Sequence, residues 1–128
     1  MAHEALVEHC LEVLSPLGPV RARRMFGGHG LYLDGLFVGI IAFNRLYLKT
    51  DAMSQPQFAA AGAEPFVYEA KGKPVTISSY WSAPAEAMDS PALMAPWARL
   101  ALQAALAAGT KVKSRPRPAA RPASAKRS

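Results

Sequence analysis

The chain has 128 residues, of which 51% are hydrophobic, and it carries one cysteine and a formal net charge of +6. This length fits one domain with a real core, and a single thiol excludes an intramolecular disulfide and favours a reducing compartment. The first residues lack the features of a signal peptide, and the longest apolar stretch, 96–108, is shorter than the roughly 20 residues that span a bilayer. We therefore expect a soluble, cytoplasmic protein without a membrane partner.

The positive charge is concentrated at the C-terminal end. Residues 109–128 contain seven basic and no acidic side chains, whereas the other 108 residues hold 8 Lys/Arg and 9 Asp/Glu, a net charge of −1. The segment has three prolines and no aromatic residue, so it cannot bury enough apolar surface to offset its ordering entropy. We predict a folded domain over 1–108 and a disordered tail over 109–128, whose cations are Lys111, Lys113, Arg115, Arg117, Arg121, Lys126 and Arg127.

The first half of the chain predicts one helix followed by strands. Apolar residues recur at helical spacing over 2–15, and β-favouring residues then dominate up to residue 50. Asp34-Gly35 is a strong type I′ hairpin signal, and Asn44-Arg45 is a weaker second turn. These turns divide the stretch into strands near 22–33, 36–43 and 46–50. The cluster of glycines at 27–30 predicts a bulge or kink in the first of them.

The second half predicts a short helix over 51–61, two strands near 65–70 and 74–81, and a final helix. Gly62 caps the short helix, and Lys71-Gly72 joins the strands. Residues 84–89 read as a loop or a single turn. Ser90-Pro91 then begins the final helix, which ends near Gly109 and is kinked or restarted by Pro96.

The resulting order α-β-β-β-α-β-β-α predicts an α+β fold. Strands in adjacent hairpins pair antiparallel, and helices cover one face of a sheet to give a two-layer sandwich. The other face of the sheet is either exposed or buried in a dimer.

No combination of residues predicts catalysis, a cofactor or a metal site. Cys10 lies on the apolar helix stripe, where neighbouring His9 points about 100° away from it, so packing is its expected role. His3 and His9 lack the i, i+4 spacing of helix ligands, and with His29 they are the only imidazoles. The segment 27–30 resembles a phosphate loop only in composition, because a strand follows it instead of a helix. We therefore expect a protein that is not an enzyme.

Two basic groups are candidates for binding. In the domain, Arg21, Arg23 and Arg24 can contact phosphate or an acidic partner, or can form a solvated strand face that pairs with Glu64, Glu69 or Asp34. In the tail, lysine and arginine spaced by proline and alanine are typical of electrostatic binding to DNA or RNA. A merely solubilising tail is the alternative.

Several sequence motifs resemble one family. Residues 23–32, Asp34-Gly35, 46–49, 65–68, Tyr80 and 96–99 together are similar to the N-terminal domain of the TfoX/Sxy family, over roughly residues 4–108. The resemblance implies a secretion-chaperone-like fold, a bacterial source and a regulatory role without catalytic residues. Its core motif consists of Arg24, Met25, Phe26, Gly27, Gly28, Gly30 and Tyr32.

The chain departs from the full-length regulators of this family in one respect. Those proteins add a C-terminal domain with helix-hairpin-helix character, and here the cationic tail stands in its place, which predicts a stand-alone N-terminal domain. The leading interpretation is a module that binds a protein partner in transcription while its tail contacts nucleic acid. The alternatives are a homodimeric interaction domain, and a small-ligand binder with a pocket near Arg24, His29 and Tyr32.

Overall fold

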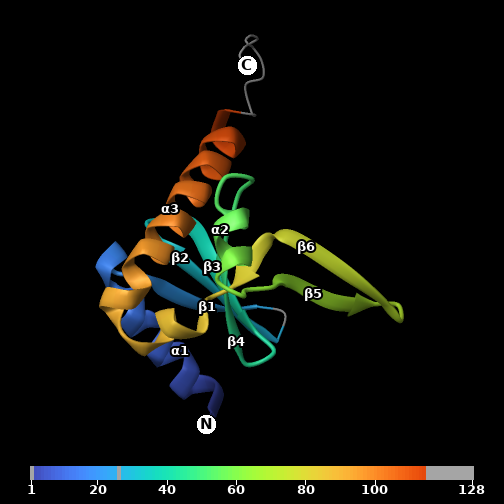
Figure 1. Cartoon of the computed structure of the whole chain (residues 1–128), viewed down its shortest axis with the longest axis horizontal. Helices are drawn as coiled ribbons and strands as arrows, with labels where there is room; N and C mark the ends of the chain where they lie inside the picture. Colours follow the sequence, from blue (N-terminus) through green and yellow to red (C-terminus); the bar gives the residue numbers. More distant parts are fainter. Residues whose placement is uncertain (1, 26, 115–128) are drawn as a thin grey trace.

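The computed structural model describes residues 2–25 and 27–114, with side chains over 5–25 and 27–108. One six-stranded sheet carries a layer of helices (Figure 1). In chain order the elements are α1 (Ala2–Val13), a 3-10 turn (Ser15–Leu17), β1 (Arg21–Met25), β2 (Gly28–Leu33), β3 (Leu36–Ala42), β4 (Arg45–Lys49), α2 (Gln55–Ala60), β5 (Pro65–Ala70), β6 (Lys73–Ser82), a second 3-10 turn (Ala85–Asp89) and α3 (Pro91–Ser114).

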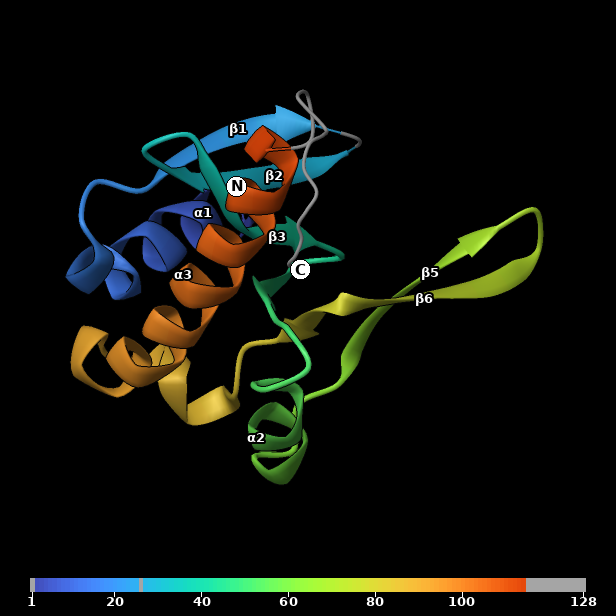
Figure 2. The same ribbon diagram turned by 90° about the horizontal axis from the view of Figure 1, so that it is seen from above.

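The sheet has the strand order β1-β2-β3-β4-β6-β5, and each neighbouring pair is antiparallel. Helices α1 and α3 pack on one face of it (Figures 1 and 2). The core lies between these layers and includes Leu14, Leu31, Ile41, Leu48 and Met94, all fully buried. The prediction of an α+β fold with an antiparallel sheet is confirmed.

Helix α3 fits closely onto the sheet because most of its inner face is built from alanine. Met94, Ala98, Ala101 and Ala105 follow one another at intervals of four, three and four, and all are buried. Alanine side chains let the helix axis approach the large aliphatic residues of the strands. No helix in the described part of the chain combines the length and apolarity needed to cross a bilayer.

The start of α3 agrees with the prediction from the sequence, and its end does not. At the start, the Ser90 hydroxyl accepts a hydrogen bond from the Leu93 backbone N–H at 3.2 Å, as an N-cap does. The helix continues through Pro96 and runs to Ser114, five residues beyond the expected end at Gly109. A glycine costs a helix only about 1 kcal/mol and does not terminate it, and the next proline is Pro116. The predicted end of the final helix is therefore too early, and the division into a domain over 1–108 and a tail over 109–128 stays a prediction.

The first expected strand is two strands. Residues 21–33 form a hairpin in which Arg21 pairs with Tyr32 and Met25 with Gly28. Gly27 therefore lies in a turn, Gly28 and Gly30 belong to the second strand, and there is no bulge within a single strand at this point. Gly27 has φ +79°, a conformation that suits glycine. The irregularity lies one strand later, where the β2–β3 register shifts between Leu31 and Tyr32.

Two of the three other hairpin turns agree with the sequence. Asp34-Gly35 and Lys71-Gly72 have positive φ at both positions, as type I′ turns require. The β3–β4 turn instead lies at Phe43-Asn44, one residue before the expected position, since Ala42 pairs with Arg45. A shift of one residue would turn Leu46 and Leu48 away from the core, and this burial decides the register.

Strand β6 belongs to two parts of the molecule. Its last residues pair with β4, and its first residues pair with β5 over the stretch Phe66–Ala70 and Lys73–Ile77. This second part, here called the arm, projects from the helix-covered body (Figures 1 and 2). Pro65 still pairs with Trp81 beside the β4 ladder, and the β5–β6 register then shifts between Pro65 and Phe66, so the arm leaves the body at this point.

Candidate functional site

The face of the sheet opposite α1 and α3, here called the open face, carries aromatic and cationic side chains. Leu31 and Leu33 of β2 are buried on the helix side, so Tyr32 between them points to the open face. Strand pairing places Phe37 opposite Tyr32, and Tyr80 opposite Lys49. Four strands therefore contribute neighbouring side chains to one surface, although the residues are far apart in the sequence.

Three rings form a continuous row on this surface. The ring centroids of Tyr32 and Phe37 are 5.0 Å apart, and those of Phe37 and Tyr80 are 5.6 Å apart. Such tilted and edge-to-face contacts are favourable and fix the rings relative to one another. Gly30 makes room for the row, because a Cβ atom there would lie 2.6 Å from the Phe37 ring. The three rings are half-buried, so each keeps part of its surface open to solvent.

Each end of the row is accompanied by a cation. The Arg23 guanidinium lies 5.9 Å from the Tyr32 ring centroid, and the Lys49 ammonium lies 4.9 Å from that of Tyr80. Burial lowers the pKa of Lys49, while burial, followed by the proximity of Tyr32, raises the pKa of Tyr80. The Tyr80 phenol therefore stays protonated and can donate a hydrogen bond over the whole physiological range.

The three arginines of β1 are exposed at the edge of the sheet. Within the described residues none of them forms an ion pair, and Glu64 instead pairs with Arg45 at 3.3 Å. Arg21 and Arg23 alternate with Ala22 and share the open face, whereas Arg24 lies opposite His29 and points to the other face. The expected cluster is therefore divided between the two faces of one edge strand.

A second group of rings surrounds the base of the arm. Phe66 stacks on Phe43 and on Tyr68, both at 5.9 Å, and meets Tyr47 edge-on at 4.8 Å. Phe43 is 68% exposed and has φ +53°, an unusual conformation for a bulky residue. Between these rings and Met25 lies a groove of about 960 Å³, which is bounded by the body on one side and by the arm on the other.

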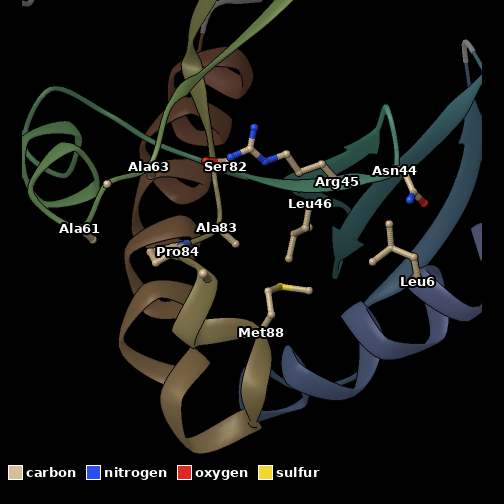
Figure 3. A pocket seen from close by; sticks show the side chains of 12 residues that line it. Leu6, Asn44, Arg45, Leu46, Ala61, Ala63, Ser82, Ala83, Pro84 and Met88 are labelled. Carbon is tan, nitrogen blue, oxygen red and sulfur yellow. The ribbon is translucent and has the colours of Figure 1, made fainter.

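A smaller pocket of about 370 Å³ opens between α1, the β3–β4 turn and the second 3-10 turn (Figure 3). Its walls are mainly aliphatic, with Leu6, Leu46 and Met88 facing one another. Arg45 is its one charged side chain and is held by Glu64, and the Ser82 hydroxyl accepts a hydrogen bond from the Glu64 backbone N–H. The pocket thus brings together no acid–base pair and no activated nucleophile.

The sequence-based idea of a pocket around Arg24, His29 and Tyr32 is not matched by the geometry. Of these three residues only His29 lines the groove. His29 and Tyr32 are three residues apart on one strand and therefore point to opposite faces. The three side chains do not converge on one ligand.

The helix residues considered for chemistry have structural roles. His9 donates a hydrogen bond from Nε2 to the Met88 carbonyl oxygen at 2.6 Å, which ties α1 to the second 3-10 turn. Cys10 is fully buried, and this burial raises the pKa of its thiol to about 12. Among the described residues no group of three His, Cys, Asp or Glu side chains is arranged to hold a metal ion.

We predict that Cys10 in the folded protein reacts negligibly with a disulfide reagent at pH 8, because the thiolate is the nucleophile and burial suppresses it. Because folding raises the pKa of the Cys10 thiol, alkaline pH is expected to lower the stability of the fold. The contribution of the neutral thiol to folding stability is complete below its ordinary pKa and is lost as pH rises from 9 towards 12. Thiol titration of native and denatured protein provides the check. Equal rates in the two states would contradict it.

The positions of the remaining site predictions are as follows. Met25 is the last residue of β1, Gly27 lies in the β1–β2 turn, Gly28, Gly30 and Tyr32 belong to β2, and Phe26 lies outside the described residues. Lys111 and Lys113 belong to the last turns of α3, whose side chains are not described there. The other tail cations lie outside the described residues; they are Arg115, Arg117, Arg121, Lys126 and Arg127.

Sequence reasoning missed the residues that complete the open face. Phe37, Lys49 and Tyr80 come from three strands, and in the sequence each is indistinguishable from an ordinary strand residue. The only indication in the sequence was that each of them neighbours a core residue in a strand, where side chains alternate between the two faces of the sheet. That signal assigns a face only when the strand neighbours are known.

Comparison with known proteins identifies one family. The model of the TfoX N-terminal domain matches residues 12–105, which is most of the chain and includes all six strands of the sheet. None of the curated proteins matches the sequence.

Proposed function

Because the chain belongs to the TfoX N-terminal domain family, we propose that it is a non-catalytic bacterial regulator that contacts single-stranded nucleic acid through its open face. Membership in this family links the chain to regulation. The observation that carries the proposal is the row Tyr32–Phe37–Tyr80, with Arg23 at one end and Lys49 at the other. Aromatic faces stack on bases irrespective of sequence, and neighbouring cations bind the backbone phosphates.

The charge of the chain supports the same chemistry. Arg21 and Arg23 lie on the open face without an ionic partner among the described residues, so binding of a phosphate requires no internal ion pair to break. The seven cations of residues 109–128 are proposed to add a non-specific contact with the same polyanion. A transcription-associated role in the cytoplasm is part of this proposal.

A salt titration separates the two cationic regions. Anisotropy of a labelled single-stranded oligonucleotide is measured over a range of salt for the whole chain, for R21A/R23A/R24A and for a chain ending at Ser114. With about 0.7 counterions released per phosphate contact, the triple variant is expected to reduce the slope of log K against log salt by about 1.4, because Arg21 and Arg23 lie on the open face and Arg24 points to the other face. Removal of the five cations after Ser114 is expected to reduce it by about 3–4.

The matched control is Arg99→Ala, which removes an exposed arginine from α3 in the helix layer. If the open face is the binding surface, this variant is expected to leave the slope unchanged. A triple variant that behaves like the control would refute the role of the β1 arginines. Binding of the chain to an acidic protein, with no affinity for oligonucleotides, would refute the proposal as a whole.

Stacking has its own test in Tyr32→Leu, which keeps an apolar side chain and removes the ring. Loss of one base–aromatic stack is expected to weaken single-strand binding about tenfold at constant salt, without a change in the salt slope. Binding to a duplex of the same sequence is expected to stay within about twofold, because paired bases are not available to the ring. Equal losses for the two substrates would argue against stacking on the open face.

A further inference from the structure

The two edges of the sheet differ in the way they are protected. Strand β1 is the edge on one side and carries three arginines in five residues, and such charges discourage pairing with another strand. Strand β5 is the opposite edge, and it has the sequence Pro-Phe-Val-Tyr-Glu-Ala, with Glu69 as its single charge. An aromatic and β-branched edge with so little charge is suited to pairing with a further strand.

The register of the arm shows which backbone groups are available for that pairing. Ala70 and Lys73 flank the two-residue Lys71-Gly72 turn, so they form a hydrogen-bonded pair. Hydrogen-bonded pairs alternate along an antiparallel ladder, which makes Val67 and Glu69 the residues whose N–H and C=O point away from β6. Pro74, which has no N–H to contribute, lies opposite Glu69, in agreement with this alternation.

The surroundings of β5 are apolar and incompletely covered. Phe43 and Val67 are 68% and 42% exposed, and the groove between the arm and the body is lined by further apolar side chains such as Met25, Ile40 and Ile77. A two-stranded hairpin that projects from a domain is only marginally stable by itself in water. Both the open edge and the groove beside it are therefore incomplete in a single copy.

We propose that β5 pairs antiparallel with β5 of a second copy, about a two-fold axis that passes beside Tyr68. The outward-pointing N–H and C=O groups of the two copies pair only in registers that set outward-facing residues opposite one another. The proposed register places Val67 opposite Glu69 of the second copy and Tyr68 opposite Tyr68 of the second copy. The alternative centred on Val67 would set Glu69 against Pro65, which lacks an N–H. The first register is therefore favoured.

The charges of the arm fit this arrangement and identify the occupant as a second copy. Glu64, which pairs with Arg45 of its own chain, lies four residues before Tyr68, and Lys71 lies three residues after it. The antiparallel copy therefore brings each Lys71 beside the Glu64 carboxylate of the other chain as a second cation. The body is attached at the start of β5 in both copies. Each arm tip thus lies against the groove of the other copy. By symmetry, the exposed Phe43 side chain of each copy is covered in the dimer.

The assembly is tested on the whole chain by sedimentation over a concentration series. Val67→Glu sets two carboxylates against each other in each half of the ladder, and it is expected to raise the dimer dissociation constant at least about tenfold. The double variant V67E/E69K restores opposite charges and is expected to recover most of the affinity. Thr76→Glu is the matched control, because Thr76 faces Val67 across the arm but lies on β6, away from the new ladder.

A cysteine at position 68 tests the register directly. Residues opposite each other in a non-hydrogen-bonded pair have Cα atoms about 4.5 Å apart, within the range of a disulfide. Under mild oxidation Y68C is expected to form a covalent dimer, whereas T76C is expected to remain uncrosslinked, and buried Cys10 does not compete. A single-chain mass at every concentration would overturn the proposal. A dimer whose dissociation constant is unchanged by V67E, or is raised as much by T76E as by V67E, would also overturn it. The nucleic-acid proposal is unaffected by either result.

Discussion

Replacement of Phe58 by alanine is expected to lower the free energy of unfolding by about 3–5 kcal/mol, the range for a large aromatic residue in a core. Among the described residues Phe58 is the largest fully buried side chain, and it is the buried residue of the six-residue helix α2. Its ring meets Trp97 of α3 edge-on at a centroid distance of 4.9 Å. A helix of this length has little stability by itself, so this contact holds α2 in place.

Thermal or denaturant unfolding measures the effect. Phe58→Leu retains most of the buried volume and is expected to lose about half as much stability as the alanine variant. Met53→Ala is the surface control, because Met53 precedes α2 and is 82% exposed, and it is expected to change stability by less than about 0.5 kcal/mol. A loss at Phe58 no larger than that of the control would contradict the packing described for α2.

Replacement of Gly39 by alanine is expected to cost about 2–3 kcal/mol, although the change adds only one methyl group. A Cβ atom at this position would lie 2.6 Å from the Tyr47 carbonyl oxygen of the neighbouring strand. Backbone cannot move aside as a side chain can, so β3 and β4 would have to separate in the centre of the sheet. Tyr47 faces the base of the arm, and the same movement is expected to disturb the groove.

The comparison for this prediction is Gly72→Ala in the turn of the arm. Nothing lies within 4 Å of a Cβ atom there, and the cost comes only from the positive φ of +79°, about 1–2 kcal/mol. Denaturant unfolding of the two variants separates steric conflict from conformational preference. If Gly39→Ala were the milder substitution, the close approach of β3 and β4 would be in error.

The sequence was informative wherever local chemistry decides the structure. Asp34-Gly35 and Lys71-Gly72 predict their turns because few residue pairs accept positive φ at both positions. Ser90-Pro91 likewise marks the start of α3 through capping chemistry. The division of charge between the domain and its C-terminal segment is a property of composition and needs no structure.

Where a local signal was weak, long-range contacts decided the outcome. Asn44-Arg45 is a reasonable turn by itself, but burial of Leu46 and Leu48 moves the turn to Phe43-Asn44 and leaves an exposed phenylalanine in a strained conformation. The glycines at 27–30 are compatible with a bulge or a hairpin. Pairing of Arg21 with Tyr32 selects the hairpin.

The sequence by itself determined the fold class, the family and the candidate arginines, because periodicity, turn residues and motifs are written along the chain. Tertiary structure alone decided that Tyr32, Phe37 and Tyr80 form one row and that Arg24 is turned away from Arg23. It alone made β5 an edge strand. The physical reason is that strand order and the facing of side chains depend on which strands pair, and pairing is set by burial of the whole core, not by any single segment.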